Sequence, residues 1–164
     1  MGTGKTGRVL NTAGSGTTVS GFAAVHSTEG KFIQSSKKHG GGLRLVSGGH
    51  GQVGMNLLDK YGIGYKVLKT YPNGVRIGNI NNHKRPNKRL HGGQSWFPKS
   101  WTLKDVIKAG THVAKLQVNR HSPDGKKLFG MFKGVRIVVI KTHGKIATVF
   151  PDTVQPNKRK GHKK

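Results

Sequence analysis

Apolar residues recur at helical spacing in two separate stretches of the chain. Between positions 52 and 61 they follow the helical period, and Gly62 stands where a glycine commonly follows the last turn. A second stretch starts at Thr102 and Asp105, a capping-box pattern with Asp in place of the usual Glu, and continues for about four turns. Gly110 weakens the pattern inside this second stretch. The spacing predicts a helix in both places.

Other stretches alternate between apolar and polar residues and are rich in β-forming side chains. Pro72, Asn73 and Gly74 form a turn signal between the first two of them. The predicted strands are 65–71, 75–80, 128–132, 135–140 and 145–150. This order predicts an α+β fold, with N-terminal helices packed on a C-terminal antiparallel sheet.

Composition divides the chain into three parts. Residues 1–42 are rich in Gly, Ser and Thr with scattered Lys, so we expect a flexible basic N-terminal segment there. The apolar run that starts at Leu43 marks the beginning of the expected folded domain, 43–155. Within it, 81–93 is expected to form a polar, basic loop, and 156–164 is expected to be a basic tail.

The charge balance favours a polyanionic partner. Of the 164 residues, 30 are Lys or Arg and 5 are Asp or Glu, so the formal net charge is +25. This excess favours nucleic acid as the partner.

The absence of cysteine excludes a disulfide framework, a cysteine-ligated zinc site and a thiol nucleophile. No apolar run approaches the roughly 20 residues of a membrane span, and the first residues lack a signal-peptide pattern, so no membrane anchoring is expected.

Nine histidines accompany five acids, and this ratio limits the chemistry that is available. Metal sites need several His, Cys, Asp or Glu ligands, and dense positive charge repels a divalent cation, so no metal is expected. A serine–histidine–aspartate centre would lack its Gly-x-Ser-x-Gly turn. Nothing in the sequence brings two carboxylates together for glycoside hydrolysis.

Cleavage of RNA by its own 2′-hydroxyl suits a chain that is rich in His and Lys. A neutral imidazole can take the hydroxyl proton, and an imidazolium or a Lys can protonate the 5′-oxygen that leaves. A Lys or Arg can stabilise the charge that develops on the phosphate. The product is a 2′,3′-cyclic phosphate, and neither metal nor cofactor is required.

Four blocks of sequence carry a resemblance to a known family. They are Ser47–Gln52 (SGGHGQ), Tyr71–Ile80 (YPNGVRIGNI), Gln94–Trp101 (QSWFPKSW) and Gly144–Pro151 (GKIATVFP). Together they resemble bacterial EndoU-type nuclease domains, which occur as C-terminal toxin modules of contact-dependent growth inhibition and other polymorphic toxin systems. The resemblance spans roughly residues 43–155, and the Trp-Phe-Pro-x-x-Trp and Thr-x-aromatic-Pro patterns are its most specific parts.

The resemblance implies an EndoU, RNase-like fold and a metal-independent endoribonuclease with a His, His, Lys centre. It implies RNA, with tRNA as the expected target, and a cognate immunity protein that neutralises the toxin. That protein should be acidic, because complementary charge speeds association. Release from a larger secreted toxin precursor and action in the cytoplasm of the target cell are further expectations.

Carried over residue by residue, the resemblance assigns His50 and Lys88 to the catalytic centre, with Lys84 as the alternative lysine. The second imidazole is left open between His39, which lies upstream of the matched histidine, and His83 or His91 in the basic loop.

The late motif supplies Thr148 and Phe150, which are expected to hold a base of the RNA. Phe150 stands where family members often have Tyr, which leaves stacking as its role.

The remaining polar residues receive simpler interpretations. Four cations are expected to contact phosphate: Lys84, Arg85, Arg89 and Arg136. The other histidines are interpreted as surface or tail residues: His26, His112, His121, His143 and His162. The cluster of Trp96, Phe97, Pro98 and Trp101 is interpreted as core.

Two alternative functions fit parts of this pattern. A non-catalytic basic protein that binds RNA or DNA explains the charge and the tail, but it does not need the Gly-Gly-His block. A DNase toxin would use spaced His and acidic metal ligands, and no such spacing is found. A chelator separates the two nuclease hypotheses, since it should stop the DNase and spare the RNase.

Overall fold

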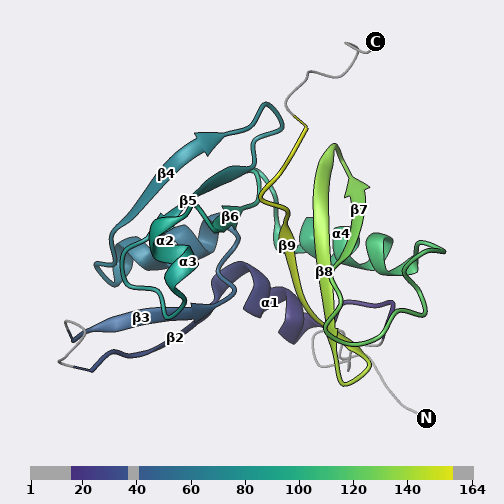
Figure 1. Cartoon of the computed structure of the whole chain (residues 1–164), viewed down its shortest axis with the longest axis horizontal. Coiled ribbons are helices and arrows are strands. Elements are labelled where there is room, and N and C mark those ends of the chain that lie inside the picture. Colours follow the sequence, from purple (N-terminus) through teal and green to yellow (C-terminus); the bar gives the residue numbers. More distant parts are fainter. Residues whose placement is uncertain (1–15, 37–40, 157–164) are drawn as a thin grey trace.

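The computed structural model describes residues 16–36 and 41–156 (Figure 1). The helices are α1 (Gly21–Glu29), α2 (Gln52–Lys60), α3 (Pro86–Leu90) and α4 (Leu103–Lys115). The strands are β2 (Lys31–Gln34), β3 (Leu43–Ser47), β4 (Tyr65–Thr70), β5 (Arg76–Ile80), β6 (Gln94–Trp96), β7 (Leu128–Phe132), β8 (Val135–Thr142) and β9 (Lys145–Pro151). They form three antiparallel sheets in the described part, ordered β2-β3, β4-β5-β6 and β7-β8-β9. The predicted α+β class is confirmed.

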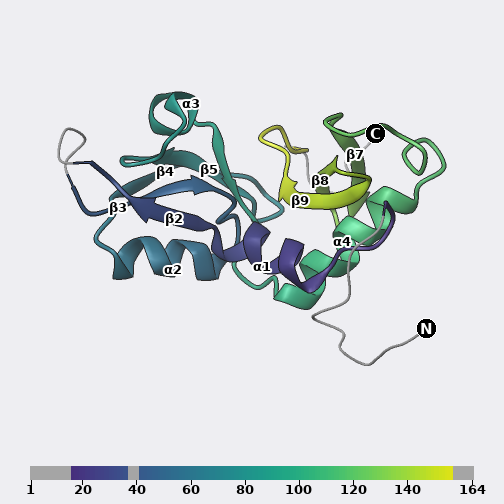
Figure 2. The same cartoon turned by 90° about the horizontal axis from the view of Figure 1, so that it is seen from below.

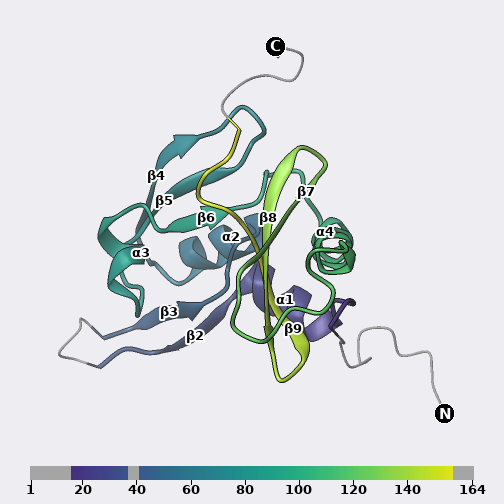
Figure 3. The ribbon, with the colours of Figure 1, turned by 45° about the vertical axis from the view of Figure 1, so that its right-hand side comes forward.

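The C-terminal sheet, β7-β8-β9, has a core face and a cavity face. Along β8, Val135, Ile137 and Val139 belong to the main core, whereas Val138 and Ile140 line a cavity. This alternation follows from the strand geometry, in which successive side chains point to opposite faces. Helices α1 and α4 contact this sheet, and Figure 3 shows α4 on one side of it and α3 on the other.

Helix α4 begins as the sequence predicts. The Thr102 hydroxyl accepts a hydrogen bond from the Asp105 N–H at 3.2 Å, and the Asp105 carboxylate accepts one from the Thr102 N–H at 2.9 Å. The helix continues through Gly110, where a Cβ atom would lie 2.6 Å from Cγ2 of Val149. The glycine therefore allows close contact between α4 and β9, which compensates for its poor helix propensity.

A second, smaller core holds the other half of the molecule together. Its buried residues come from β3, α2, β5, β6 and the turn after α2: Leu45, Met55, Leu58, Ile63, Ile80 and Trp96. Trp96 and Phe97 are 0 % and 1 % exposed, which confirms the interpretation of the Trp-Phe-Pro cluster as core. Figure 2 shows α1, α2 and α4 together below the strands and α3 above them.

Ordered structure begins earlier than the sequence analysis expects. Helix α1 and strand β2 both lie within 1–42, for which composition predicts a flexible segment. Tertiary contacts explain the difference: Ala24 and Ser27 are fully buried, and the Ser27 hydroxyl accepts a hydrogen bond from the Val149 N–H at 2.9 Å. Small polar residues that resemble a linker in sequence here allow a helix to pack closely against β9.

The expected basic loop, 81–93, also contains regular structure. The short helix α3 lies within it, with Pro86 in its first turn. His83 forms an isolated parallel bridge with Leu45 of β3, so the start of this segment is tied to the second core. The segment forms one side of the cavity described next.

Candidate active site

A cavity of about 570 Å³ lies between the open face of β8-β9, the α3 segment and the end of β3. Seven of the residues selected from the sequence line it: His50, His83, Arg85, Lys88, His91, Thr148 and Phe150. Three others do not line it, namely Lys84, Arg89 and Arg136. His39 lies outside the described residues. The structure thus brings together side chains that are up to 100 positions apart, from residue 50 to residue 150.

The Gly-Gly-His block packs directly against the end of α1. The N–H groups of Gly49 and His50 donate to the carbonyls of His26 and Ser27 at 3.3 and 2.7 Å. Gly48 has a φ of +72°, and a Cβ atom there would overlap the His26 carbonyl. Two glycines are therefore needed before His50, because this turn requires positive φ and close backbone contact.

His50 is buried and held in one tautomer. Its Nδ1 lies 2.7 Å from the carbonyl oxygen of Ser95. A carbonyl oxygen can only accept, so Nδ1 carries the proton and Nε2 keeps its lone pair. Burial, followed by the nearby Lys88 cation, holds the pKa of His50 well below its usual 6.5. The imidazole is neutral at pH 7, which is the form that can accept a proton.

Lys88 supplies a cation at the same cavity. It lies on α3, and burial together with the cations of Arg85 and Lys127 lowers its pKa from 10.5 to about 8. It therefore remains mostly protonated at pH 7. The α3 segment that carries it is held by the Arg89 guanidinium, which donates to the His83 carbonyl. The role of Arg89 in the free protein is thus structural.

His83 occupies a different kind of position. Its Nδ1 accepts a hydrogen bond from the Arg85 N–H at 2.9 Å, and the residue is 1 % exposed. Burial and the surrounding cations Lys88, Arg85 and Arg89 lower its pKa to about 3. An imidazole that remains neutral to such low pH cannot act as a proton donor of the imidazolium type near neutrality.

His26 is a cavity residue that the sequence analysis misses. It comes from α1 and is half-buried, and its Nε2 lies 3.3 Å from the Ser47 hydroxyl oxygen. Burial, followed by the Lys31 cation, lowers its pKa below 6.5. The interpretation of His26 as a surface residue is therefore wrong. Its position depends on α1, a helix whose buried positions carry small residues and therefore no apolar pattern.

Strand β9 forms the opposite wall of the cavity. A register irregularity after Ile140 of β8 places Ala147 and Thr148 together at the cavity. Phe150 follows, and its ring stacks on the His50 ring with centroids 5.2 Å apart and planes 24° apart. Arg136 is outside this wall, where its Nε atom lies 3.0 Å from the carboxylate of Asp152.

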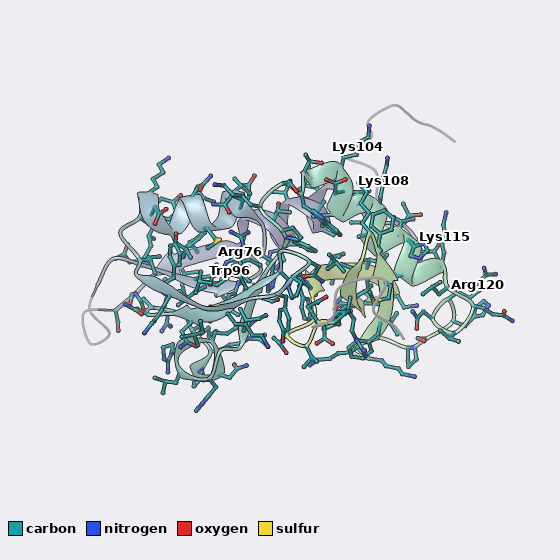
Figure 4. All side chains as sticks on the ribbon, turned by 90° about the horizontal axis from the view of Figure 1, so that it is seen from above. Arg76, Trp96, Lys104, Lys108, Lys115 and Arg120 are labelled. Carbon is teal, nitrogen blue, oxygen red and sulfur yellow. The ribbon has the colours of Figure 1, made fainter. Side chains whose placement is uncertain are left out.

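Exposed cations also cover the far side of the molecule. Lys104, Lys108 and Lys115 lie along α4 and Arg120 follows it, on the side that is turned away from the sheet (Figure 4). None of these four lines the cavity. They offer matched positions for control substitutions.

Within residues 16–36 and 41–156, no group of three or more His, Asp or Glu side chains is arranged to hold a metal ion. None of the helices in these ranges has the length and apolar character needed to cross a bilayer.

This geometry suits proton transfer around an anionic substrate. A neutral imidazole, a second imidazole and an ammonium group lie at one cavity, at His50, His26 and Lys88. The His50 imidazole can accept a proton, and the Lys88 ammonium group can stabilise negative charge in a site partly shielded from water.

Comparison with known proteins identifies one family. A family model described as "Bacterial EndoU nuclease" matches residues 23–153. The match starts within α1, so the matched region includes His26 as well as His50 and Phe150. No curated protein and no solved structure matches the chain.

Proposed function

The chain belongs to the bacterial EndoU nuclease family, and from this premise we propose that it is an endoribonuclease that cleaves RNA through the 2′-hydroxyl. The observation that carries the proposal is the pairing of a buried, neutral His50 with a protonated Lys88 at one cavity. RNA brings its own nucleophile to such a site, so the protein needs only to move protons and to stabilise charge. No cofactor takes part in the proposed reaction.

His50 is proposed as the general base. Its Nε2 takes the proton of the 2′-hydroxyl, and the resulting oxygen attacks the adjacent phosphorus. The P–O5′ bond breaks, and a 2′,3′-cyclic phosphate is left on one fragment. The hydrogen bond from Nδ1 to the Ser95 carbonyl fixes the ring and stabilises the positive charge that it gains.

His26 is proposed as the second imidazole, which returns a proton to the 5′-oxygen. The two alternatives within the described residues fit less well: His83 is 1 % exposed with a pKa of about 3, and His91 is an exposed residue at the end of α3. His26 is half-buried, and an RNA phosphate beside it would favour its charged form. Lys88 stabilises the charge on the phosphate as the bonds change.

Further contacts to the RNA are proposed at the cavity rim. Arg85 and Lys127 are exposed cations that line the cavity and can bind the backbone, and the Thr148 hydroxyl can contact a base. The related proposals are a tRNA target, an acidic cognate immunity protein, and delivery from a larger toxin precursor into the cytoplasm of a target cell. The net charge of +25 supports the acidic partner, because opposite charges speed association.

The test is incubation of the purified chain with total bacterial RNA in excess EDTA, followed by analysis of the fragment ends. Discrete fragments ending in 2′,3′-cyclic phosphate are expected. His50→Ala and Lys88→Ala should abolish them, whereas Lys108→Ala on the outer side of α4 should not. Intact RNA with tight, salt-sensitive binding would instead favour a non-catalytic basic protein, and activity lost with EDTA would favour a metal-dependent nuclease.

A further inference from the structure

Ser95 connects the His50 ring to the end of β9. Its carbonyl oxygen accepts the His50 Nδ1 proton at 2.7 Å, and its hydroxyl donates to the Pro151 carbonyl at 2.6 Å. The Phe97 N–H donates to the His50 carbonyl at 2.7 Å, which ties His50 to the residue that follows β6. One serine therefore fixes the distance between His50 and the residue next to Phe150.

The stacked rings lie within this frame. Phe150 pairs with Val138 of β8, and both side chains reach the cavity face of the sheet. The Phe150 ring covers one face of the His50 ring, at a centroid distance of 5.2 Å and an interplanar angle of 24°. His50 is 4 % exposed, and its Nδ1 hydrogen bond to the Ser95 carbonyl restrains the ring from the other side.

We propose that Phe150 is a positioning residue for His50, and that it acts on the imidazole rather than on a base of the RNA. Together with the Ser95 carbonyl, its ring holds Nε2 in one direction and keeps water from one face of the imidazole. This inference rests on the proposed role of His50 as the general base. It replaces the base-stacking role that the family resemblance implies for Phe150.

The ionisable neighbours of His50 determine the sign of the expected effect. His26 faces it from α1, Lys88 from α3 and His83 from the segment between β5 and α3, and all three disfavour a charged imidazole at His50. Arg85 and Lys127 add positive charge at the rim, while Asp152 is paired with Arg136. Removing the Phe150 ring admits water to the imidazole face and changes none of these charges. The pKa of His50 should then rise toward 6.5.

The decisive comparison is Phe150→Ala with Phe150→Tyr, and Phe129→Ala serves as the control for loss of an aromatic ring outside the cavity. Phe150→Ala should lower kcat by about tenfold to a hundredfold, since a poorly oriented base reacts slowly, with little change in KM. The acidic limb of the pH profile should move to higher pH. Phe150→Tyr should leave both kcat and the acidic limb close to wild type, because it retains a ring over the imidazole. Phe150→Leu tests the same loss of the flat ring if the alanine variant does not fold.

A raised KM with changed base preference, at unchanged kcat and an unchanged acidic limb, would overturn the inference in favour of base stacking. NMR titration of the His50 imidazole in the same variants needs no cleavage. If the wild-type chain does not cleave RNA, the proposed function fails, and the titration still measures the coupling between the rings. If the wild-type chain cleaves and Phe150→Ala changes neither kcat nor the His50 titration, only the positioning role fails.

Discussion

Replacing His26 with alanine tests which group protonates the leaving oxygen. The ring is half-buried, and its Nε2 makes a hydrogen bond of 3.3 Å with the Ser47 hydroxyl. One such bond contributes roughly 1 kcal/mol, so the variant should fold. Loss of a general acid should lower kcat by about a hundredfold to ten-thousandfold on ordinary RNA.

An RNA with sulfur in place of the bridging 5′-oxygen isolates this step. A thiolate leaves without needing a proton, so the acid becomes dispensable on this substrate. The defect of His26→Ala should shrink to within about tenfold, while His50→Ala should be impaired on both substrates because the 2′-hydroxyl still needs a base. His121→Ala, a change to an exposed histidine, should behave as wild type on both.

The result that refutes this reasoning is an equal defect of His26→Ala on both substrates. The ring would then bind the substrate or support the turn before His50, and another group would donate the proton. Rescue of Lys88→Met by the sulfur substrate would identify that group as Lys88.

Two further predictions concern Lys88 and Gly110. Lys88→Arg keeps its charge above the lysine pKa of about 8. The ratio of its cleavage rate to that of wild type should therefore rise by about tenfold per pH unit above that value, and a constant ratio up to high pH would contradict a role for the Lys88 charge. Gly110→Ala places a Cβ atom 2.6 Å from methyl carbons of Val149 and Val19. It should lower the free energy of unfolding by about 1–3 kcal/mol in a urea titration, and unchanged stability would contradict the close packing of α4 on β9.

Local signals in the sequence predict the elements whose ends are determined by nearby residues. The capping pair Thr102 and Asp105 starts α4 in the structure as in the prediction. The turn between β4 and β5 also follows the sequence signal, since Gly74 of the Pro-Asn-Gly segment adopts a positive φ. Such features depend on a few neighbouring residues, and a single sequence is sufficient to predict them.

Helix α1 shows where this approach fails. Its capping residue, Ser20, is an ordinary helix-start signal, but the helix has small residues at its buried positions, including Ala23, Ala24 and Ser27. Its stability comes from contacts with α2, α4 and β9, all of which come later in the chain. Propensity and periodicity do not contain this information, and His26 is missed for the same reason.

The cavity itself could be predicted only as a set of residue types. The family resemblance selects His50, Lys88 and the late Thr-x-aromatic motif, and the structure brings these to one cavity. The stacking of Phe150 on His50 depends on the link through Ser95, a residue to which no sequence pattern assigns a role. A contact of this kind is set by the register of β9 against β8 and by the path of β6, which are tertiary properties.

The positive field of the site has opposite consequences before and after substrate binding. In the free protein, burial and neighbouring cations lower the pKa of His26 and of His50. Both rings are therefore neutral, and His50 can accept a proton. A bound phosphate adds negative charge beside the same rings and favours their protonated forms. Binding of a non-cleavable 2′-deoxy oligonucleotide should therefore raise the pKa of His26 in an NMR titration, and it would convert this ring into a proton donor only when substrate is present. An unchanged or lowered pKa would show that the phosphate binds away from α1, and His26 would lose its proposed role.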